Sequence, residues 1–182
     1  MCPEIQLAIL VRLGSRPNRH LRRWARRFDH WRTWDGAETP AGIPDARNAL
    51  VRWFLGECDL PWLLMMDQDT VPLAETEPLL RSEAPIAGPR IWARTGQEAH
   101  PHGLSAACLK VRRRVLEAIE PPWFRYVPRK GQCECQYFVN RARRAGLRPH
   151  KVGLVGHRFP VVVLPGADGP VFRFDSEISH GR

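Results

Sequence analysis

Two carboxylates separated by one residue, Asp67 and Asp69, offer the clearest chemistry in the sequence. The five apolar residues 62–66 precede them, and Pro72 follows. A short apolar run bounded by breakers is typical of a strand buried on both faces of a mostly parallel sheet, and ligands bind beyond the carboxyl ends of such strands. Paired carboxylates there suit Mg²⁺ or Mn²⁺, which in turn hold substrate phosphates. The alternative is a pair of solvated turn residues, since Asp also favours turns.

Length and charge narrow the classes of protein to consider. The 182 residues predict one domain, 1–182, with a partly extended C-terminal tail over 160–182. The net charge of +9 predicts attraction to polyanions such as nucleic acid, nucleotide phosphates or an anionic surface. Nearly all of the positive charge is arginine, because lysine occurs only at positions 110, 130 and 151.

Cysteine content and hydropathy indicate a reducing, aqueous compartment. Five cysteines at irregular spacings argue against a disulfide framework. The N-terminus lacks the pattern of a signal peptide, and no apolar run approaches the ~20 residues that cross a bilayer. We therefore expect a cytoplasmic protein without membrane insertion.

Predicted strands and helices alternate along the chain. Strands are expected at 7–11, 62–66, 84–88, 104–109 and 152–155, and helices from 18 to about 34, then at 46–57, 72–81, 111–119 and 131–145. Asp45 is expected to cap the 46–57 helix. The alternation predicts an α/β fold, a single-domain three-layer sandwich with a mostly parallel central sheet. The arginines of the first helix form either a solvated face or a phosphate-tracking one.

Several short motifs occur in a specific order between residues 43 and 158. They are Ala46-Arg47-Asn48, Asp67-Gln68-Asp69, Ile86-Ala87-Gly88, Pro122-Trp123-Phe124, Glu134 and Gly156-His157. This order resembles the GT-A nucleotide-diphospho-sugar glycosyltransferases, particularly the short single-domain members of bacteriophages and bacteria. The resemblance implies a GT-A, Rossmann-like sandwich and transfer of a sugar from a nucleotide-diphosphate donor to an acceptor hydroxyl.

The resemblance also implies roles for individual residues around the donor. Asp67 and Asp69 would bind the divalent ion and, through it, the donor diphosphate. His157 matches the late metal-binding histidine of the family, and an imidazole ligand favours Mn²⁺ over Mg²⁺. Arg47 and Asn48 match a pair that lies near the nucleotide-sugar.

The acceptor side of the implied site departs from the family pattern. Glu134 matches one of two acids at the start of the late helix, where a carboxylate takes the proton of the acceptor hydroxyl. Cys135 occupies the place of the second acid. Glu134 is therefore the candidate catalytic base, and its alternative role is a helix N-terminal acid stabilised by the helix dipole. Modified phage DNA is one candidate acceptor.

Two other functions fit parts of the sequence. The first is a non-catalytic, basic nucleic-acid-binding protein, suggested by the arginine-rich helix and its tryptophans. The second is a zinc site made by Cys133, Cys135, His100 and His102, whose residue types suit tetrahedral Zn²⁺ although their spacing is unlike that of zinc fingers.

Overall fold

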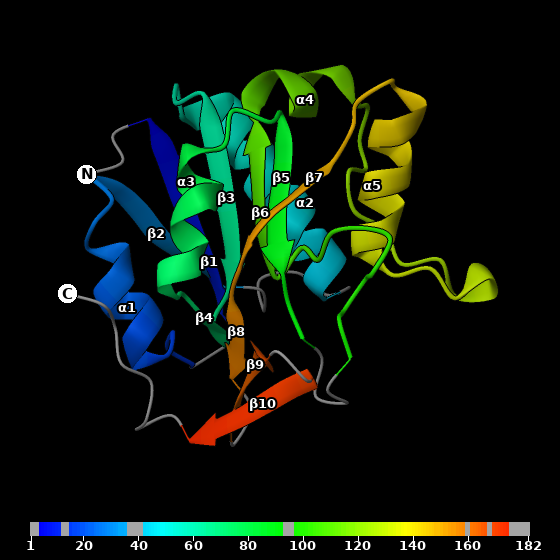
Figure 1. Ribbon diagram of the computed structural model, residues 1–182. Coiled ribbons are helices and arrows are strands. Elements are labelled where there is room, and N and C mark those ends of the chain that lie inside the picture. The colour runs from blue at the N-terminus through cyan, green and yellow to red at the C-terminus, as the bar shows by residue number, and fades with distance from the viewer. Residues whose placement is uncertain are drawn as a thin grey trace.

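A six-stranded sheet forms the centre of the computed structural model, which describes residues 4–11, 15–35, 42–92, 97–158, 161–166 and 169–174. The strand order is β2 (His30–Asp35), β1 (Ile5–Val11), β3 (Trp62–Asp67), β6 (Cys108–Arg112), β5 (Ile86–Arg90) and β7 (His150–Leu154). β6 is antiparallel to both of its neighbours, and the other five strands run in one direction. The predicted mostly parallel sheet is confirmed (Figure 1).

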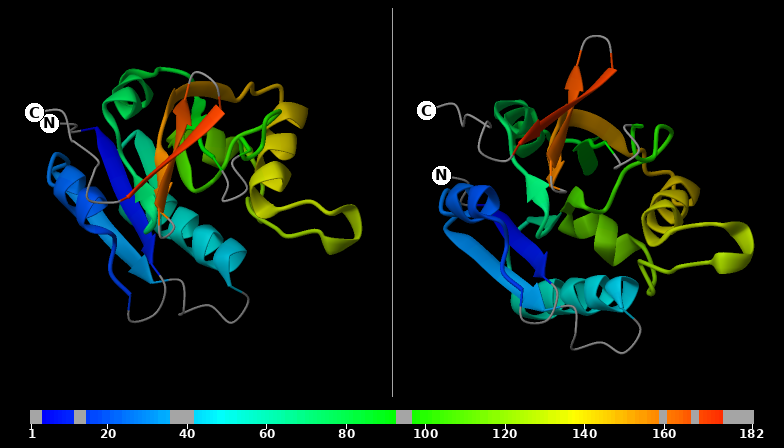
Figure 2. Two further views of the ribbon diagram at one scale, coloured as in Figure 1. Left: turned by 60° about the horizontal axis from the view of Figure 1, so that its bottom comes forward. Right: turned by 90° about the horizontal axis from the view of Figure 1, so that it is seen from below.

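Helices cover both faces of this sheet. α2 (Ile43–Glu57), α4 (Arg113–Ala118) and α5 (Glu134–Arg144) pack on one face, whereas α1 (Arg19–Ala25) and α3 (Glu77–Arg81) pack on the other. β3 contributes to the hydrophobic core on each face of the sheet. Leu63 and Met65 face α2, α4 and α5, whereas Leu64 and Met66 face α1 and α3. This alternation follows from the period of two in a strand. The three-layer α/β sandwich is therefore confirmed (Figure 2).

The helix predicted from residue 18 to about 34 is wrong in its second half. α1 ends at Ala25, and residues 30–35 form the edge strand β2, parallel to β1. The segment contains Trp31, Thr33 and Trp34, residue types that favour strands, and Trp34 packs on Trp53 of α2 with ring centroids 5.9 Å apart. Tertiary packing thus overrides the helical spacing of the tryptophans.

Other element boundaries shift by a few residues. α2 begins at Ile43, with Gly42 as its N-cap, so the prediction that Asp45 caps it is wrong and Asp45 lies in the first turn. Pro44 is responsible, because proline is favoured at the first helical positions. β6 begins at Cys108, which is four residues later than the sequence predicts.

A second, four-stranded antiparallel sheet lies beyond the carboxyl ends of the main parallel strands. Its order is β10 (Gly169–Phe174), β9 (Val161–Gly166), β8 (Gly156–Arg158) and β4 (Thr70–Val71). The tail predicted from residue 160 onward thus contains two paired strands where the structure describes it. Because β4 directly follows the acid pair, this sheet brings the late part of the chain to the end of β3 (Figures 1 and 2).

β7 crosses closely over the short 3-10 helix η2 (Ala74–Thr76) on its way to β8. Gly153 has φ +74°, and a Cβ there would lie 2.3 Å from the Glu75 carbonyl oxygen. Only glycine permits this approach without strain. Thr76 Oγ1 donates to the Leu154 carbonyl at 2.8 Å. These contacts fix the position from which β8 starts.

None of the helices described here combines the length and apolarity needed to cross a bilayer.

Candidate functional site

Asp67, the last residue of β3, is held by a buried arginine of α2. Arg47 is only 1 % exposed, and its Nη2 donates to both carboxylate oxygens of Asp67, at 2.9 and 3.1 Å. Arg47 Nη1 donates to the Ala106 carbonyl at 2.9 Å, and Nε lies 3.9 Å from Glu134 Oε1 without a hydrogen bond. One guanidinium therefore connects the strand end with the start of α5.

Burial raises the pKa of the Asp67 carboxyl, and the neighbouring Asp69 carboxylate acts in the same direction, whereas Arg47 opposes the rise. Burial also works against the charge of Arg47, but its interactions with Asp67, Cys135 and Glu134 outweigh this effect and its pKa is raised. The site is thus rich in negative charge, which one arginine balances in part. A cation beside Asp69 would reduce the remaining repulsion.

The loop between β3 and β4 is fixed by Asn18, a residue that sequence reasoning did not place in the site. Asn18 Nδ2 donates to the carbonyls of Gln68 and Thr70, at 2.9 and 2.8 Å, while its Oδ1 accepts from Leu21 N and caps α1. Asparagine before a helix predicts a cap, but no sequence signal predicts bonds across fifty residues. The loop that carries Asp69 is consequently preorganised.

Asp69 and His157 come together at the edge where β4 pairs with β8. Thr70 is opposite His157 in the ladder, and Arg158 N donates to the Asp69 carbonyl at 2.7 Å. Asp69 Oδ2 and His157 Nε2 lie 3.1 Å apart. Adjacent ligands of an octahedral ion with bonds of about 2.1 Å are separated by about 3 Å. The pair therefore fits two neighbouring positions around Mn²⁺ or Mg²⁺.

A polar cavity of about 300 Å³ opens beside this pair. Its lining residues are Arg16, Asn18, Gln68, Asp69 and Arg158. Two guanidinium groups and one carboxylate around a small open space can hold an anionic group together with a cation.

Asn48, predicted to lie near a nucleotide-sugar, binds the backbone of the segment before α5. Its side chain is 4 % exposed; Nδ2 donates to the Phe124 carbonyl at 2.8 Å, and Oδ1 accepts from Phe124 N at 3.0 Å. Phe124 itself is buried and stacks on Phe138 of α5. The amide thus joins α2 to the segment before α5, and contact with a donor stays a prediction.

Glu134 and Cys135 begin α5 and differ in their surroundings. The Glu134 side chain is 18 % exposed. Cys135 is buried, accepts a hydrogen bond from Ala106 N at 3.2 Å and lies 3.5 Å from Glu134 Oε1. Cys135, at the place of the second acid, is therefore a buried thiol next to the Glu134 carboxylate.

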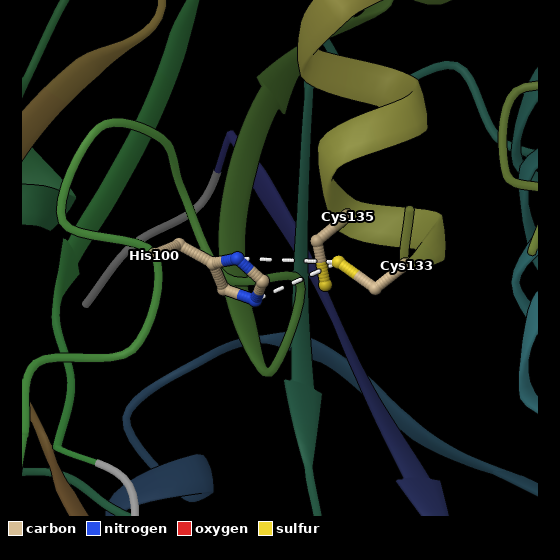
Figure 3. A group of neighbouring side chains, drawn as sticks. All are labelled: His100, Cys133 and Cys135. Atoms are coloured by element: carbon tan, nitrogen blue, oxygen red, sulfur yellow. Dashed lines mark hydrogen bonds between the residues drawn. The ribbon is translucent and has the colours of Figure 1, made fainter. Parts of the chain in front are cut away.

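Cys133 and His100 complete a cluster with Cys135 (Figure 3). Cys133 Sγ lies 3.8 Å from His100 Nε2 and 3.9 Å from its Nδ1, and it accepts from Gln136 N at 3.4 Å. The Cys135 thiol and His100 stabilise the thiolate and lower the pKa of Cys133 to about 4, while the pKa of Cys135 is raised. The pKa of His100 is raised, chiefly by its hydrogen bond to Cys133. His102 lies outside this group.

No protein-family model and no curated protein matches the chain. The chain is similar in structure to A197 from STIV, with a TM-score of 0.68 and 15 % identity, covering 98 % of this chain and 100 % of that one. It is also similar to a protein from Bacillus anthracis named as a glucose-1-phosphate thymidylyltransferase and crystallised with sucrose. There the TM-score is 0.50 and the identity 11 %, over 84 % of this chain and 89 % of the other. At these identities the comparisons establish a shared fold.

Proposed function

We propose that this chain is a divalent-metal-dependent glycosyltransferase of the GT-A type that takes its sugar from a nucleotide-diphosphate donor. The observation that carries the proposal is the Asp69–His157 pair, 3.1 Å apart, beside a cavity lined by Arg16 and Arg158. The fold shared with a protein named as a glucose-1-phosphate thymidylyltransferase supports a nucleotide-sugar as substrate.

Different residues of the chain bind the cation and the phosphates of the donor. Asp69 and His157 hold the cation, with Asp67 adjoining them and held in place by Arg47. When bound, Mn²⁺ or Mg²⁺ neutralises the charge that develops on the departing diphosphate. Arg16 and Arg158 pair with phosphate oxygens from the cavity wall. Because Asn18 fixes the loop, these groups need little rearrangement when the donor binds.

Glu134 is the proposed base at the acceptor. Its carboxylate takes the proton of the acceptor hydroxyl as the bond from that oxygen to the sugar forms and the bond from the sugar to the diphosphate breaks. The partly exposed carboxylate at the start of α5 supports this role. The buried thiol of Cys135 supports a single base here, where the family has two acids.

A panel of nucleotide-sugars with Mn²⁺ tests the proposal, with nucleoside diphosphate release and thermal stabilisation as readouts. We expect Asp69→Asn to abolish both signals, because the cation loses a charged ligand. Glu134→Gln is expected to keep donor-induced stabilisation and lose transfer. Asp59→Asn, an exposed residue before β3, is the matched control and should behave like the unmodified protein.

The same experiment can refute the assignment. If the Asp69→Asn protein binds Mn²⁺ and donor as the unmodified protein does, Asp69 is not part of the donor site. If the unmodified protein releases diphosphate from no donor and none stabilises it, the transferase proposal fails.

A non-catalytic nucleic-acid-binding protein is the second candidate, favoured by the outer face of α1. Arg19, Arg22 and Arg23 are exposed there, and Arg26 and Arg27 follow on the next turn. A steep loss of DNA affinity with rising salt, without diphosphate release from any donor, would select it. DNA affinity together with donor turnover would instead indicate DNA as the acceptor.

A further inference from the structure

Three potential soft-metal ligands meet beside α5, and none of them is a residue of the acid pair. His100 comes from the segment after β5, Cys133 is the N-cap of α5, and Cys135 lies in its first turn. One ligand atom from each lies within 4.8 Å of the others. In Figure 3 the imidazole ring of His100 faces the sulfur of Cys133, with that of Cys135 beside it.

The separations can be compared with those of a tetrahedral zinc centre. Zn–S bonds of about 2.3 Å and Zn–N bonds of about 2.05 Å place sulfur and nitrogen about 3.6 Å apart at the tetrahedral angle. The observed distance from Cys133 Sγ to His100 Nε2 is 3.8 Å. Ligation therefore requires movements of only a few tenths of an ångström for this pair.

Backbone contacts also prepare the sulfurs for a metal. Ala106 N donates to Cys135 Sγ and Gln136 N to Cys133 Sγ, at 3.2 and 3.4 Å. Hydrogen bonds to ligand atoms orient them and tune a metal site. His100 has φ +56° and is the one non-glycine residue with positive φ in the described part of the chain.

We infer that His100, Cys133 and Cys135 form a binding site for a zinc-class cation, independent of the Asp69–His157 pair. Thiolates select Zn²⁺ over Mn²⁺ and Mg²⁺, which favour oxygen ligands. Three protein ligands leave the fourth tetrahedral position to solvent, as in zinc sites that keep an open position. Glu134 lies 3.5 Å from Cys135 Sγ and borders the three ligands without being one of them. Binding takes both sulfurs as thiolates and the imidazole as neutral, and the displaced protons pass to solvent.

Titration of the metal-free, reduced protein with Co²⁺ tests this site directly. We expect thiolate-to-cobalt charge-transfer absorption, d–d bands of tetrahedral intensity, and loss of both on adding one equivalent of Zn²⁺. Cys133→Ser, Cys135→Ser and His100→Gln should each weaken Zn²⁺ binding more than about 100-fold, since even changes to residues that only orient the ligands cost about 10–100-fold.

Two control variants show whether the cobalt spectrum comes from these three residues. The thiol of Cys58 faces the Gln6 side chain, so Cys58→Ser should leave the cobalt spectrum unchanged. Asp69→Asn should also leave it unchanged while removing the proposed donor binding, so that the two proposals can fail separately.

Protection from alkylation keeps the test valid if a cysteine variant does not fold. In the unmodified protein, Zn²⁺ should slow iodoacetamide modification of Cys133, the partly exposed thiol of the cluster, as read by mass spectrometry. An unchanged modification rate at Cys133, or a folded protein that gives no thiolate-to-cobalt band, would overturn the inference.

Discussion

A single guanidinium, that of Arg47, balances the carboxylate at the end of β3. Because it is buried and bonded to both oxygens of Asp67, its removal leaves the partly buried Asp67 carboxylate without its cation. Breaking such a pair typically costs about 3–5 kcal/mol. We expect Arg47→Ala to lower the free energy of unfolding by about that amount, as measured by urea denaturation.

The matched control for Arg47 lies on the same helix. Arg52 of α2 is exposed, and Arg52→Ala should change the free energy of unfolding by no more than ~0.5 kcal/mol. Equal losses in the two variants would show that the Arg47–Asp67 pair does not hold the strand end in place.

Individual residues of the site were predictable to different degrees. Asp67 and Asp69 could be found because a buried strand leads into them, and their position at its end is confirmed. Asn18 could not, since its amide acts on carbonyls fifty residues away. His157 was expected only by resemblance, and its approach to Asp69 depends on a strand pairing that local sequence does not encode.

At the scale of elements, one ion pair joins the two helices that cover the same face of the sheet. Arg27, just after α1, donates to both carboxylate oxygens of Glu77 at the start of α3, with Nη2 to Oε2 at 2.9 Å. Hydrogen bonding to Arg27 is the main cause that lowers the pKa of Glu77 below 4.5. The pair therefore favours the folded state when Glu77 is ionised.

The pH dependence of this contribution follows from the lowered pKa. A group with a lower pKa in the folded state adds stability above its unfolded value near 4.5, and this stability is lost as the pH falls through the folded value. We expect Glu77→Gln to cost about 0.5 kcal/mol at pH 7, because partly exposed pairs contribute little. In denaturation at decreasing pH the difference from the unmodified protein should vanish.

An exposed neighbour provides the comparison for Glu77. Glu83→Gln, after α3, should show no such difference at pH 7. A cost for Glu77→Gln that persists unchanged under acidic conditions would contradict the ion pair as its cause.

The sequence pattern predicts most helices and strands of the central sandwich. It does not predict the edge strand β2 or the second sheet. β3 is a continuous apolar run and α5 ends just before Gly146, and both were predicted nearly in place. β2 was missed because its aromatic residues also fit a helical period, and only pairing with β1 decides between the two. The second sheet was missed because β4 has two residues, too few for any periodicity.

At the scale of the molecule, the proposed cation site spans two sheets. Asp69 follows β3 of the central sheet, and His157 lies in β8 of the smaller one. An ion held by both should stabilise the folded state against separation of the sheets. Binding to the folded state alone adds about 2.7 kcal/mol at a concentration about 100 times Kd. We expect Mn²⁺ to raise Tm in a concentration-dependent manner.

Variants identify the source of this stabilisation. Asp69→Asn and His157→Gln should each remove the rise in Tm with Mn²⁺, whereas Cys133→Ser should retain it because Mn²⁺ prefers oxygen and imidazole ligands to thiolates. A rise that survives both changes at Asp69 and His157 would place the manganese elsewhere on the chain.

The pairing of β4 with β8 also bears on the order of events during synthesis. Asp69 leaves the ribosome long before His157, so a nascent chain carries the acids without their imidazole partner. An ion held by both residues, as proposed, would therefore not guide early folding of the growing polypeptide. It would be captured only after His157 has emerged from the ribosome and the small sheet has formed at the end of β3.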